Sequence, residues 1–461
     1  MSHACADGNL GLGRVKFISA GESVFCVAAS VALCSGAAAQ QIDVPPLSTA
    51  SIVQLDYETL FQQMYKSPSN LDVSFKFAEQ AVARGDYEAA IGALERMLFF
   101  NPNLPRVKLE LGVLYFKLGS FELARGYLQD AVKGADVPDD IHAQVRAYLA
   151  EIDRRLSRYE YSVFLQGGMR YQTNANLGPN GLMVRALGQD AILGKQFGKH
   201  PDWNYFQTVS AYYAYKMNLR GDAIEVTFQG LNSTQVKLDQ FNLGLIEVTV
   251  GQRVAVGQNA SFKYYGIGDQ VWLGGANYFN AIGGGLSART TVGSFGIVEA
   301  YIEDRHRNFF DSLNYPTASQ QTGELITAAI TTDVASGALH WVTRVGYDEG
   351  RAIFNYNSYK RYSIDVAFPF AFELQLFGTP HQFVFAPTAG YSRADYAAPD
   401  PLLDRKIIRH DNEQRYGAIF DAQIVDNLGV RTEVQYFRID STLSNYTTNS
   451  FSIAVGPTVR F

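Results

Sequence analysis

The sequence is poor in charge: 18% of its 461 residues are Asp, Glu, Lys or Arg, below the usual quarter of a soluble globular protein. It also has no run of 18 or more apolar residues after about position 40, and its mean hydropathy is only −0.09. A bundle of membrane-spanning helices is therefore excluded. The 39 basic residues do not outnumber the 45 acidic ones, so there is no basic excess for holding a phosphate backbone, and nucleic acid is not an expected partner.

Cysteine is scarce too, and all of it lies close to the N-terminus: Cys5, Cys26 and Cys34. The same region resembles a secretory signal peptide, with Arg14 and Lys16 before an apolar stretch at 23–33 and small residues at Ala37–Ala39. Eleven apolar residues are too few for the alternative, an N-terminal membrane anchor. We expect cleavage after Ala39, which leaves an exported chain with no thiol and no disulfide framework.

Apolar residues recur at helical spacing over 70–158, after a linker at 40–69 that holds a short candidate helix, 53–65. Within this part, the hexapeptide 85–90 matches the hexapeptide 119–124. This spacing, about 34 residues, resembles the period of the tetratricopeptide repeat, a pair of helices joined at a turn glycine. We call it the repeat interval. A further helix at 139–156 would cap the repeats.

The repeat has a functional implication. Tetratricopeptide repeats form a concave face that binds peptides or proteins, mainly through the first helix of each pair. The residues that we expect on this cargo-binding face are Phe75, Glu79, Val82, Leu109, Val113, Phe116 and Lys117. The alternative is that these side chains only form the core between helices.

From residue 159 to 461 the period changes from helical to two. For example, Ile224, Val226 and Phe228 alternate with polar residues. The alternating segments run for ten or more residues, longer than ordinary soluble strands and long enough to cross a membrane at a tilt. We count about fourteen such segments, with twelve or sixteen as alternatives. The last segment, 451–461, resembles the terminal strand that the barrel-assembly machinery recognises, with Phe461 as the assembly signal.

These patterns predict the fold class: a transmembrane antiparallel β-barrel of about 14 strands at 159–461, preceded by an all-α tetratricopeptide-repeat domain at 70–158, a linker at 40–69 and a signal peptide at 1–39. A large soluble β-protein is the alternative fold for the strand-rich part.

The order of these parts resembles the surface lipoprotein assembly modulator family, and the junction at 148–177 is its most specific segment. There a last helix ends in Arg154-Arg155, a strand follows at 161–171, and an asparagine-rich turn follows at 173–177. The resemblance implies an outer-membrane protein whose periplasmic repeats bind a cargo or chaperone and whose barrel helps a lipoprotein or soluble protein to reach the cell surface. The implied partners are that protein cargo or a periplasmic chaperone, the barrel-assembly machinery and outer-membrane lipid.

Enzymatic chemistry has little support in the sequence. The seven histidines are scattered and none has metal-ligand spacing, and the charged cluster around His306 is typical of a solvated strand end. The glycine groups at 266–268 and 283–285 do not open helices, so they are not nucleotide loops. We expect no enzymatic activity, no metal and no cofactor. The alternative functions are an export porin for exopolysaccharide or small solutes, and an uptake receptor or structural barrel.

Overall fold

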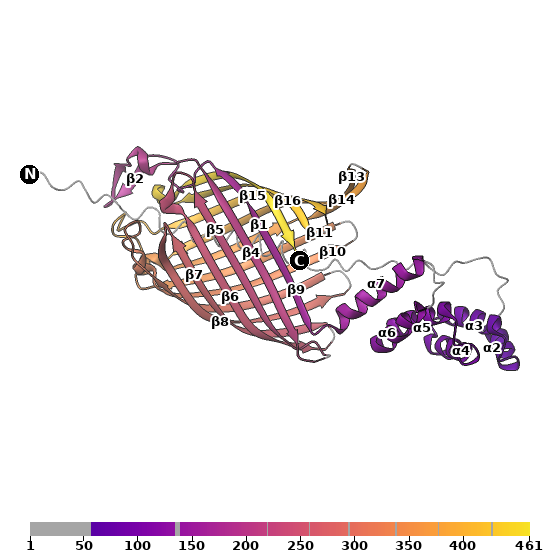
Figure 1. Cartoon of the computed structure of the whole chain (residues 1–461). Coiled ribbons are helices and arrows are strands. Elements are labelled where there is room, and N and C mark those ends of the chain that lie inside the picture. The colour runs from indigo at the N-terminus through magenta and orange to yellow at the C-terminus, as the bar shows by residue number, and fades with distance from the viewer. Residues whose placement is uncertain are drawn as a thin grey trace, which may run out of the picture. The chain divides into compact units, whose positions relative to one another are not determined.

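The computed structural model describes residues 57–133, 139–218, 220–257, 259–293, 296–336, 339–376, 378–425 and 427–461. The predicted signal peptide at 1–39 lies outside these residues, as does the linker up to residue 56. The chain divides into two compact units, a helical one that ends at Arg158 and a strand-rich one that begins at Tyr159 (Figure 1). No helix in the described ranges is long and apolar enough to cross a membrane.

The helical unit is a series of antiparallel hairpins. Gly85 and Gly119 form the turns with positive φ values of 79° and 76°, a conformation that favours glycine. The side chains of Asn70 and Asp86 accept hydrogen bonds from the backbone amides of Val73 and Ala89 and so cap their helices. The described helices are α2 (Tyr57–Lys66), α3 (Leu71–Ala83), α4 (Tyr87–Phe100), α5 (Pro105–Lys117), α6 (Phe121–Ala131) and α7 (Asp139–Leu156).

The repeat interval recurs from α3 onward. Helix α5 begins one repeat interval after α3, and α7 begins one repeat interval after α5. Val107, Leu111 and Leu114 of α5 pack against the preceding hairpin, and their counterparts one interval later in α7 pack in the same way. Helix α7 is therefore the first helix of a third repeat, which agrees with the expected capping helix.

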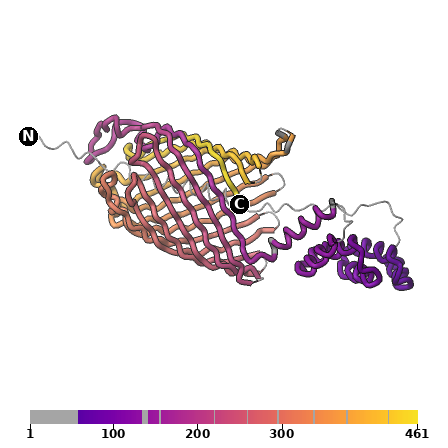
Figure 2. Tube along the Cα trace, viewed as in Figure 1, coloured from indigo at the N-terminus to yellow at the C-terminus, as the bar shows by residue number. Residues whose placement is uncertain are grey.

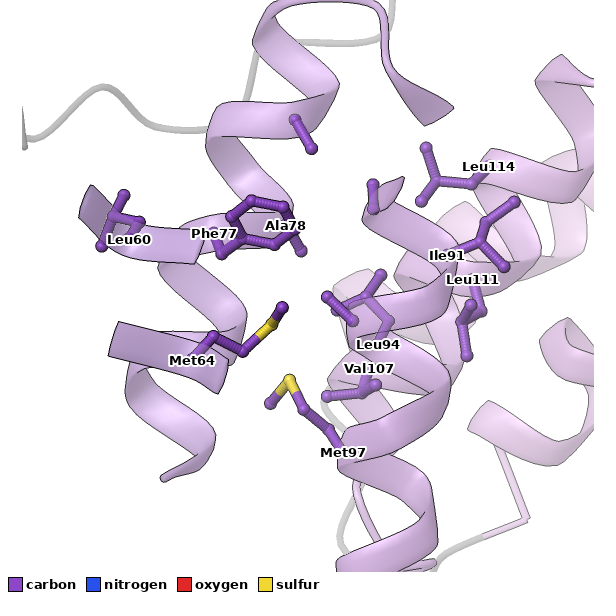
Figure 3. Close-up of a cluster of buried hydrophobic side chains, with 13 residues drawn as sticks. Leu60, Met64, Phe77, Ala78, Ile91, Leu94, Met97, Val107, Leu111 and Leu114 are labelled. Carbon is purple, nitrogen blue, oxygen red and sulfur yellow. The ribbon is translucent and has the colours of Figure 1, made fainter. Parts of the chain in front are cut away.

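Two apolar clusters hold the hairpins together. The first joins α2 to α5 and contains Phe77, Leu94 and Leu111 at its centre (Figure 3). The second joins α5, α6 and α7. Gly112 lies where α5 and α6 approach closely, because a Cβ added there would be 2.6 Å from Cγ of Leu128. The absence of a side chain at this position lets the two helices of the hairpin come together.

The strand-rich unit is a closed antiparallel barrel (Figures 1 and 2). Fourteen strands form the ring, since β1 pairs with β17 and β12 pairs with β14. The ring strands are β1 (Tyr159–Gln172), β4 (Asp202–Lys216), β5 (Ala223–Gln235), β6 (Leu243–Val256), β7 (Ala260–Leu273), β8 (Ala276–Val292), β9 (Gly296–Phe309), β10 (Gly323–Ser336), β11 (Leu339–Ala352), β12 (Tyr359–Ala367), β14 (Thr379–Tyr396), β15 (His410–Val425), β16 (Leu428–Ser441) and β17 (Thr448–Arg460). The predicted fold class and strand number are confirmed.

Among the described residues, three shorter strands lie outside this ring. β2 (Met183–Ala186) and β3 (Gln189–Ile192) form a hairpin within the connection from β1 to β4. β13 (Phe370–Leu376) extends the line of β12 and pairs with the first half of β14.

The two faces of the wall differ as the alternation predicts. On β5, Ile224 points outward and is 45% exposed, whereas its neighbour Glu225 points inward and is 6% exposed. Outward positions of other ring strands are mostly apolar, including Val250, Ile302 and Ile364. The ring strands have 9 to 18 residues, enough to cross a hydrocarbon core. An apolar outer wall on strands of this length makes the barrel a transmembrane one.

The connections differ between the two ends of the barrel. At the end where β1 begins, they are short and no longer than the six residues of 217–222, apart from the connection 368–378, which contains β13. We call this the near end, because the helical unit joins the barrel there through the chain. At the far end the longer connections are 173–201, 310–322 and 397–409.

Candidate functional site

The predicted cargo-binding residues occupy equivalent positions in two repeats. Phe75, Glu79 and Val82 lie on α3, and Leu109, Val113 and Phe116 lie one repeat interval later on α5. Lys117 is the last residue of α5 and is exposed. The two helices, however, present these positions differently.

On α5 these positions belong to the second apolar cluster. Leu109 is only 5% exposed and packs with α6 and α7 residues. The Phe116 ring lies edge-to-face against Tyr148 of α7, with ring centroids 5.3 Å apart, and Val113 packs at the margin of the same cluster. Helix α7 covers this part of α5, so Leu109 is a core residue rather than a cargo contact.

On α3 the position that corresponds to Leu109 keeps more solvent access. Phe75 and Val82 are half-buried at the margin of the first cluster, and the Arg106 guanidinium lies 5.0 Å above the centre of the Phe75 ring. The Lys117 ammonium lies 5.8 Å from the centre of the Tyr87 ring. Phe75 thus has a cation over its ring, and charged side chains from α5 are close to the first repeat.

One residue that the sequence pattern missed is Glu110 of α5. Burial raises the pKa of the Glu110 carboxyl, the nearby Glu79 raises it further, and Arg106 and Lys117 oppose the shift. Burial also raises the pKa of the Tyr148 hydroxyl, which has no hydrogen-bond partner among the described residues.

The helical period could have placed Glu110 next to the predicted face, because it sits one turn before Val113. Glu110 interacts electrostatically with Glu79, Arg106 and Lys117, and Arg106 in turn lies over the Phe75 ring. We call these five residues the α3–α5 face.

The inward face of the barrel is lined by compensated charges. Glu225 forms ion pairs with the Arg253 guanidinium at 2.9 Å and with the Lys263 ammonium at 3.0 Å. The Tyr212 hydroxyl donates to the same carboxylate at 2.8 Å. The Arg305 guanidinium contacts three carboxylates, those of Glu247, Asp269 and Glu303, from three other positions of the wall.

A second group of ion pairs lines another part of the ring. Arg415 of β15 donates to Asp365 of β12 at 2.7 Å, across β14. Asp421 receives the guanidinium of Arg431 at 2.7 Å and also contacts Arg460. These pairs join strands that are adjacent or one strand apart, so they fix the inward charges in place and make this face polar with both signs present.

At the far end, three connections pack into one structured cap: 173–201, 397–409 and the shorter connection 442–447 between β16 and β17. The Arg185 guanidinium of β2 binds Asp404 at 2.7 Å, and the Arg185 backbone exchanges two hydrogen bonds with the Asn445 side chain. The Lys406 backbone amide, and next the Arg185 guanidinium, lower the pKa of the Asp404 carboxyl.

The asparagine-rich turn that the sequence singled out is an anchor of this cap. Asn174 is fully buried and donates to Thr448 at 2.9 Å, which ties the turn to the start of β17. Its side-chain oxygen also accepts a hydrogen bond from the Gly178 amide at 2.9 Å. The turn therefore fixes the first connection of the far end against the last strand.

In the part of the chain that the structure describes, no three His, Cys, Asp or Glu residues are grouped as they would be to hold a metal ion. His306 faces outward and contacts Glu324 at 2.7 Å, a position near the far end of the wall.

A comparison with protein families identifies the repeats of the helical unit. Residues 81–152 match the family model of the tetratricopeptide repeat. The comparison with curated proteins gives no match.

Three solved structures are each similar to one unit of this chain. The type III secretion chaperone SycD of Yersinia enterocolitica, solved with a peptide of the translocator YopD, is 13% identical over 22% of this chain and 79% of that chain, with a TM-score of 0.21. A FadL homologue of Pseudomonas aeruginosa is 12% identical over 66% of this chain and 90% of that chain, with a TM-score of 0.35. OprB of Pseudomonas putida is 7% identical over 68% of this chain and 96% of that chain, with a TM-score of 0.31.

Proposed function

We propose that this outer-membrane barrel protein assists the translocation of a protein cargo, a lipoprotein or a soluble protein, to the cell surface. The repeats bind the cargo or its chaperone, and the barrel acts as the conduit. The observation that carries this proposal is the direct connection between the two units: α7 ends at Leu156 and β1 begins at Tyr159. A repeat unit that is joined to the barrel by so short a connection suits the transfer of a polypeptide from the repeats to the barrel.

The helical unit belongs to the periplasm in this proposal. It joins the barrel at the near end, where the connections are short, and short turns are typical of the periplasmic side of outer-membrane barrels. The far end, with its longer connections and its cap, is then the cell-surface end. Cleavage of the helical unit by a protease added to intact cells would contradict this orientation. We further propose that the protein acts by binding and passage, without enzymatic chemistry.

Cargo binding is assigned to the α3–α5 face. Phe75 supplies apolar area, and Glu79, Arg106, Glu110 and Lys117 supply charges of both signs on the same two helices. Side chains of this kind, an aromatic anchor with a polar rim, are what a peptide-binding surface requires.

The test is the surface delivery of a co-expressed candidate cargo. A chain without residues 70–158 should still insert a barrel, because the strand ladder closes on itself, but should deliver no cargo. Full delivery by the repeat-less chain would refute the division of labour.

A milder variant tests the α3–α5 face itself. The charge swap Glu79→Lys with Lys117→Glu should lower delivery while the helical unit stays folded. The matched control is the charge swap Asp130→Lys with Lys133→Asp, because this exposed ion pair on and after α6 lies outside the face. Equal delivery by the two swapped chains would mean that the cargo binds elsewhere.

A second function, export of exopolysaccharide or small solutes, is favoured by one observation, the polar inward face. Rows of Arg, Asp and Glu side chains suit a polar solute as well as an extended polypeptide. Single-channel recordings in planar bilayers separate the two functions. A steady open conductance that is unchanged when residues 70–158 are removed would favour the solute conduit.

A further inference from the structure

The strand β13 leaves the ring at the near end of the barrel. β12 ends at Ala367 and β13 begins at Phe370, and both pair with the same strand, β14. On its other side, β12 pairs with β11 only as far as Ala367 opposite Val342. The hairpin of β13 and β14 therefore projects past its neighbour β11, as Figure 1 shows. Among the described residues, β13 has a strand partner on one side only.

Proline explains where the pairing with β11 stops. The backbone amide of Phe368 donates to the carbonyl of Pro387 in β14 at 3.0 Å. Because hydrogen-bonding directions alternate along an antiparallel strand, the next residue, Pro369, faces β11. Proline has no amide hydrogen to donate there, so the ladder between β11 and the line of β12 ends at this point.

The same alternation identifies the free backbone groups. Phe370, Phe372 and Leu374 have the parity of Phe368, so their amides and carbonyls face β14. Ala371, Glu373 and Gln375 direct their amides and carbonyls to the unpaired edge. These three residues offer alternating donors and acceptors along an extended backbone.

The two faces of β13 are amphipathic. Phe370, Phe372 and Leu374 point to the outer side and are exposed, and the Phe372 ring stacks on Phe383 with centroids 5.6 Å apart. Glu373 and Gln375 point to the opposite side. The strand carries a single charge in seven residues, whereas edge strands of soluble proteins are commonly protected by several charges, a bulge or a covering segment.

We propose that the free edge of β13 binds an extended polypeptide segment by β-strand addition, with apolar and polar residues alternating along that segment. The row of donors and acceptors at Ala371, Glu373 and Gln375 matches the backbone of an extended chain. The added strand would continue the barrel sheet beside β11, with its apolar side chains next to Phe370 and Phe372. This inference rests on the proposed function, in which the cargo is a polypeptide, and specifies how the near end recognises it.

The experiment measures peptide binding rather than cargo delivery. The probe is a fluorescent peptide of about seven alternating valine and threonine residues, the length of β13, titrated with the full chain in detergent micelles and followed by anisotropy. Glu373→Pro removes one edge donor and keeps the ladder with β14, whereas Glu373→Thr keeps the donor and removes the charge. We expect binding by the wild type and by Glu373→Thr, and binding about tenfold weaker or lost for Glu373→Pro.

A second control changes the probe instead of the protein. The same peptide with N-methylated amides keeps its side chains but cannot donate to a strand edge, so its binding should be lost. A heat-modifiable band on gels verifies that Glu373→Pro remains a folded barrel. If this variant does not fold, the comparison between the methylated and unmethylated peptides still decides. Equal binding of the two peptides, or no binding of the unmethylated peptide, would overturn the proposal.

This result is separable from the proposed function. Edge-dependent peptide binding together with full cargo delivery by the repeat-less chain would leave the β13 site standing and reject the role of the repeats. If cargo delivery depends on the repeats but peptide binding does not depend on the β13 edge, the role of the repeats stands and the β13 site is rejected.

Discussion

Val163 and Phe461 exchange two backbone hydrogen bonds: the Phe461 amide donates to the Val163 carbonyl at 2.9 Å, and the Val163 amide donates back at 3.0 Å. This pair ends the ladder between β1 and β17, the contact that closes the ring. Further along, the ladder has no paired residues at Gly167 and Gly168. The closure therefore depends on two short runs of pairs, one of which ends at Phe461.

Removal of Phe461 should weaken this closure. The deletion eliminates both hydrogen bonds with Val163, leaving only a few pairs between this end and the interruption. We expect the protein to be depleted from the outer membrane while its synthesis continues, which immunoblots of membrane fractions measure. Phe461→Tyr is the control, since it keeps the backbone and an aromatic ring. Normal amounts of heat-modifiable barrel after the deletion would contradict the prediction.

Arginine scanning should distinguish the two faces of the wall. Phe420 points outward on β15, so Phe420→Arg should cost roughly 2 to 4 kcal/mol if this position lies near the middle of the bilayer. Gln423 points inward on the same strand, and Gln423→Arg should be tolerated. Folding into liposomes at a series of urea concentrations measures both. Equal losses would mean that the faces are misassigned.

The alternation of side chains made the barrel predictable from sequence. A period of two over ten or more residues states both that a strand exists and which face is apolar, and the structure places Ile224 and Glu225 accordingly. Alternation does not reveal partners, however. From alternation alone, an arginine should be tolerated at the inward position Asp365. In the structure, however, Asp365 binds Arg415 at 2.7 Å, so an arginine there would face a like charge.

The candidate site was less predictable, for a related reason. Leu109 and Phe116 occupy the repeat positions of Phe75 and Val82, yet α7 covers them because a third repeat helix follows. The cap depends on contacts such as Arg185 with Asp404, which no local period encodes. Pairings between residues so far apart in the sequence are set by the tertiary structure.

Two glycines of the helical unit should respond in opposite directions to alanine. A Cβ at Gly92 of α4 meets no atom within 4 Å, so Gly92→Ala should stabilise the unit by roughly 0.5 to 1 kcal/mol. A Cβ at Gly112 would lie 2.6 Å from Leu128, so Gly112→Ala should destabilise it, by about 1 to 3 kcal/mol. Urea unfolding of the full chain, followed by the helical circular dichroism signal, measures both. Stabilisation by Gly112→Ala would show that α5 and α6 are not in close contact.

Glu110 should make the stability of the helical unit depend on pH. Burial raises the pKa of this carboxyl in the folded unit, so the folded state binds a proton more tightly than the unfolded state. Its effect on stability is therefore most favourable below the unfolded pKa, and is lost as the pH rises through the raised folded pKa. Glu110→Gln should stabilise the unit at neutral pH and flatten the dependence between pH 4 and 7, about the range above the usual glutamate pKa. Thermal unfolding across this range measures the effect, and an unchanged profile would contradict it.

The interruption in the closing ladder gives the last prediction. Gly456 of β17 approaches β1 so closely that a Cβ would lie 1.7 Å from the Gly167 carbonyl oxygen. That oxygen belongs to the backbone, so no side-chain movement can relieve the contact, and the two strands must separate. The neighbouring Pro457 has no amide hydrogen with which to hold them. Gly456→Ala should therefore destabilise the closed ring by at least about 1 to 3 kcal/mol and lower the temperature at which the folded band is lost on gels. Gly268→Ala is the matched control on β7, because the nearest atom to its Cβ is 4.0 Å away. If both variants lose the folded band at the wild-type temperature, β1 and β17 are not in close contact at this point.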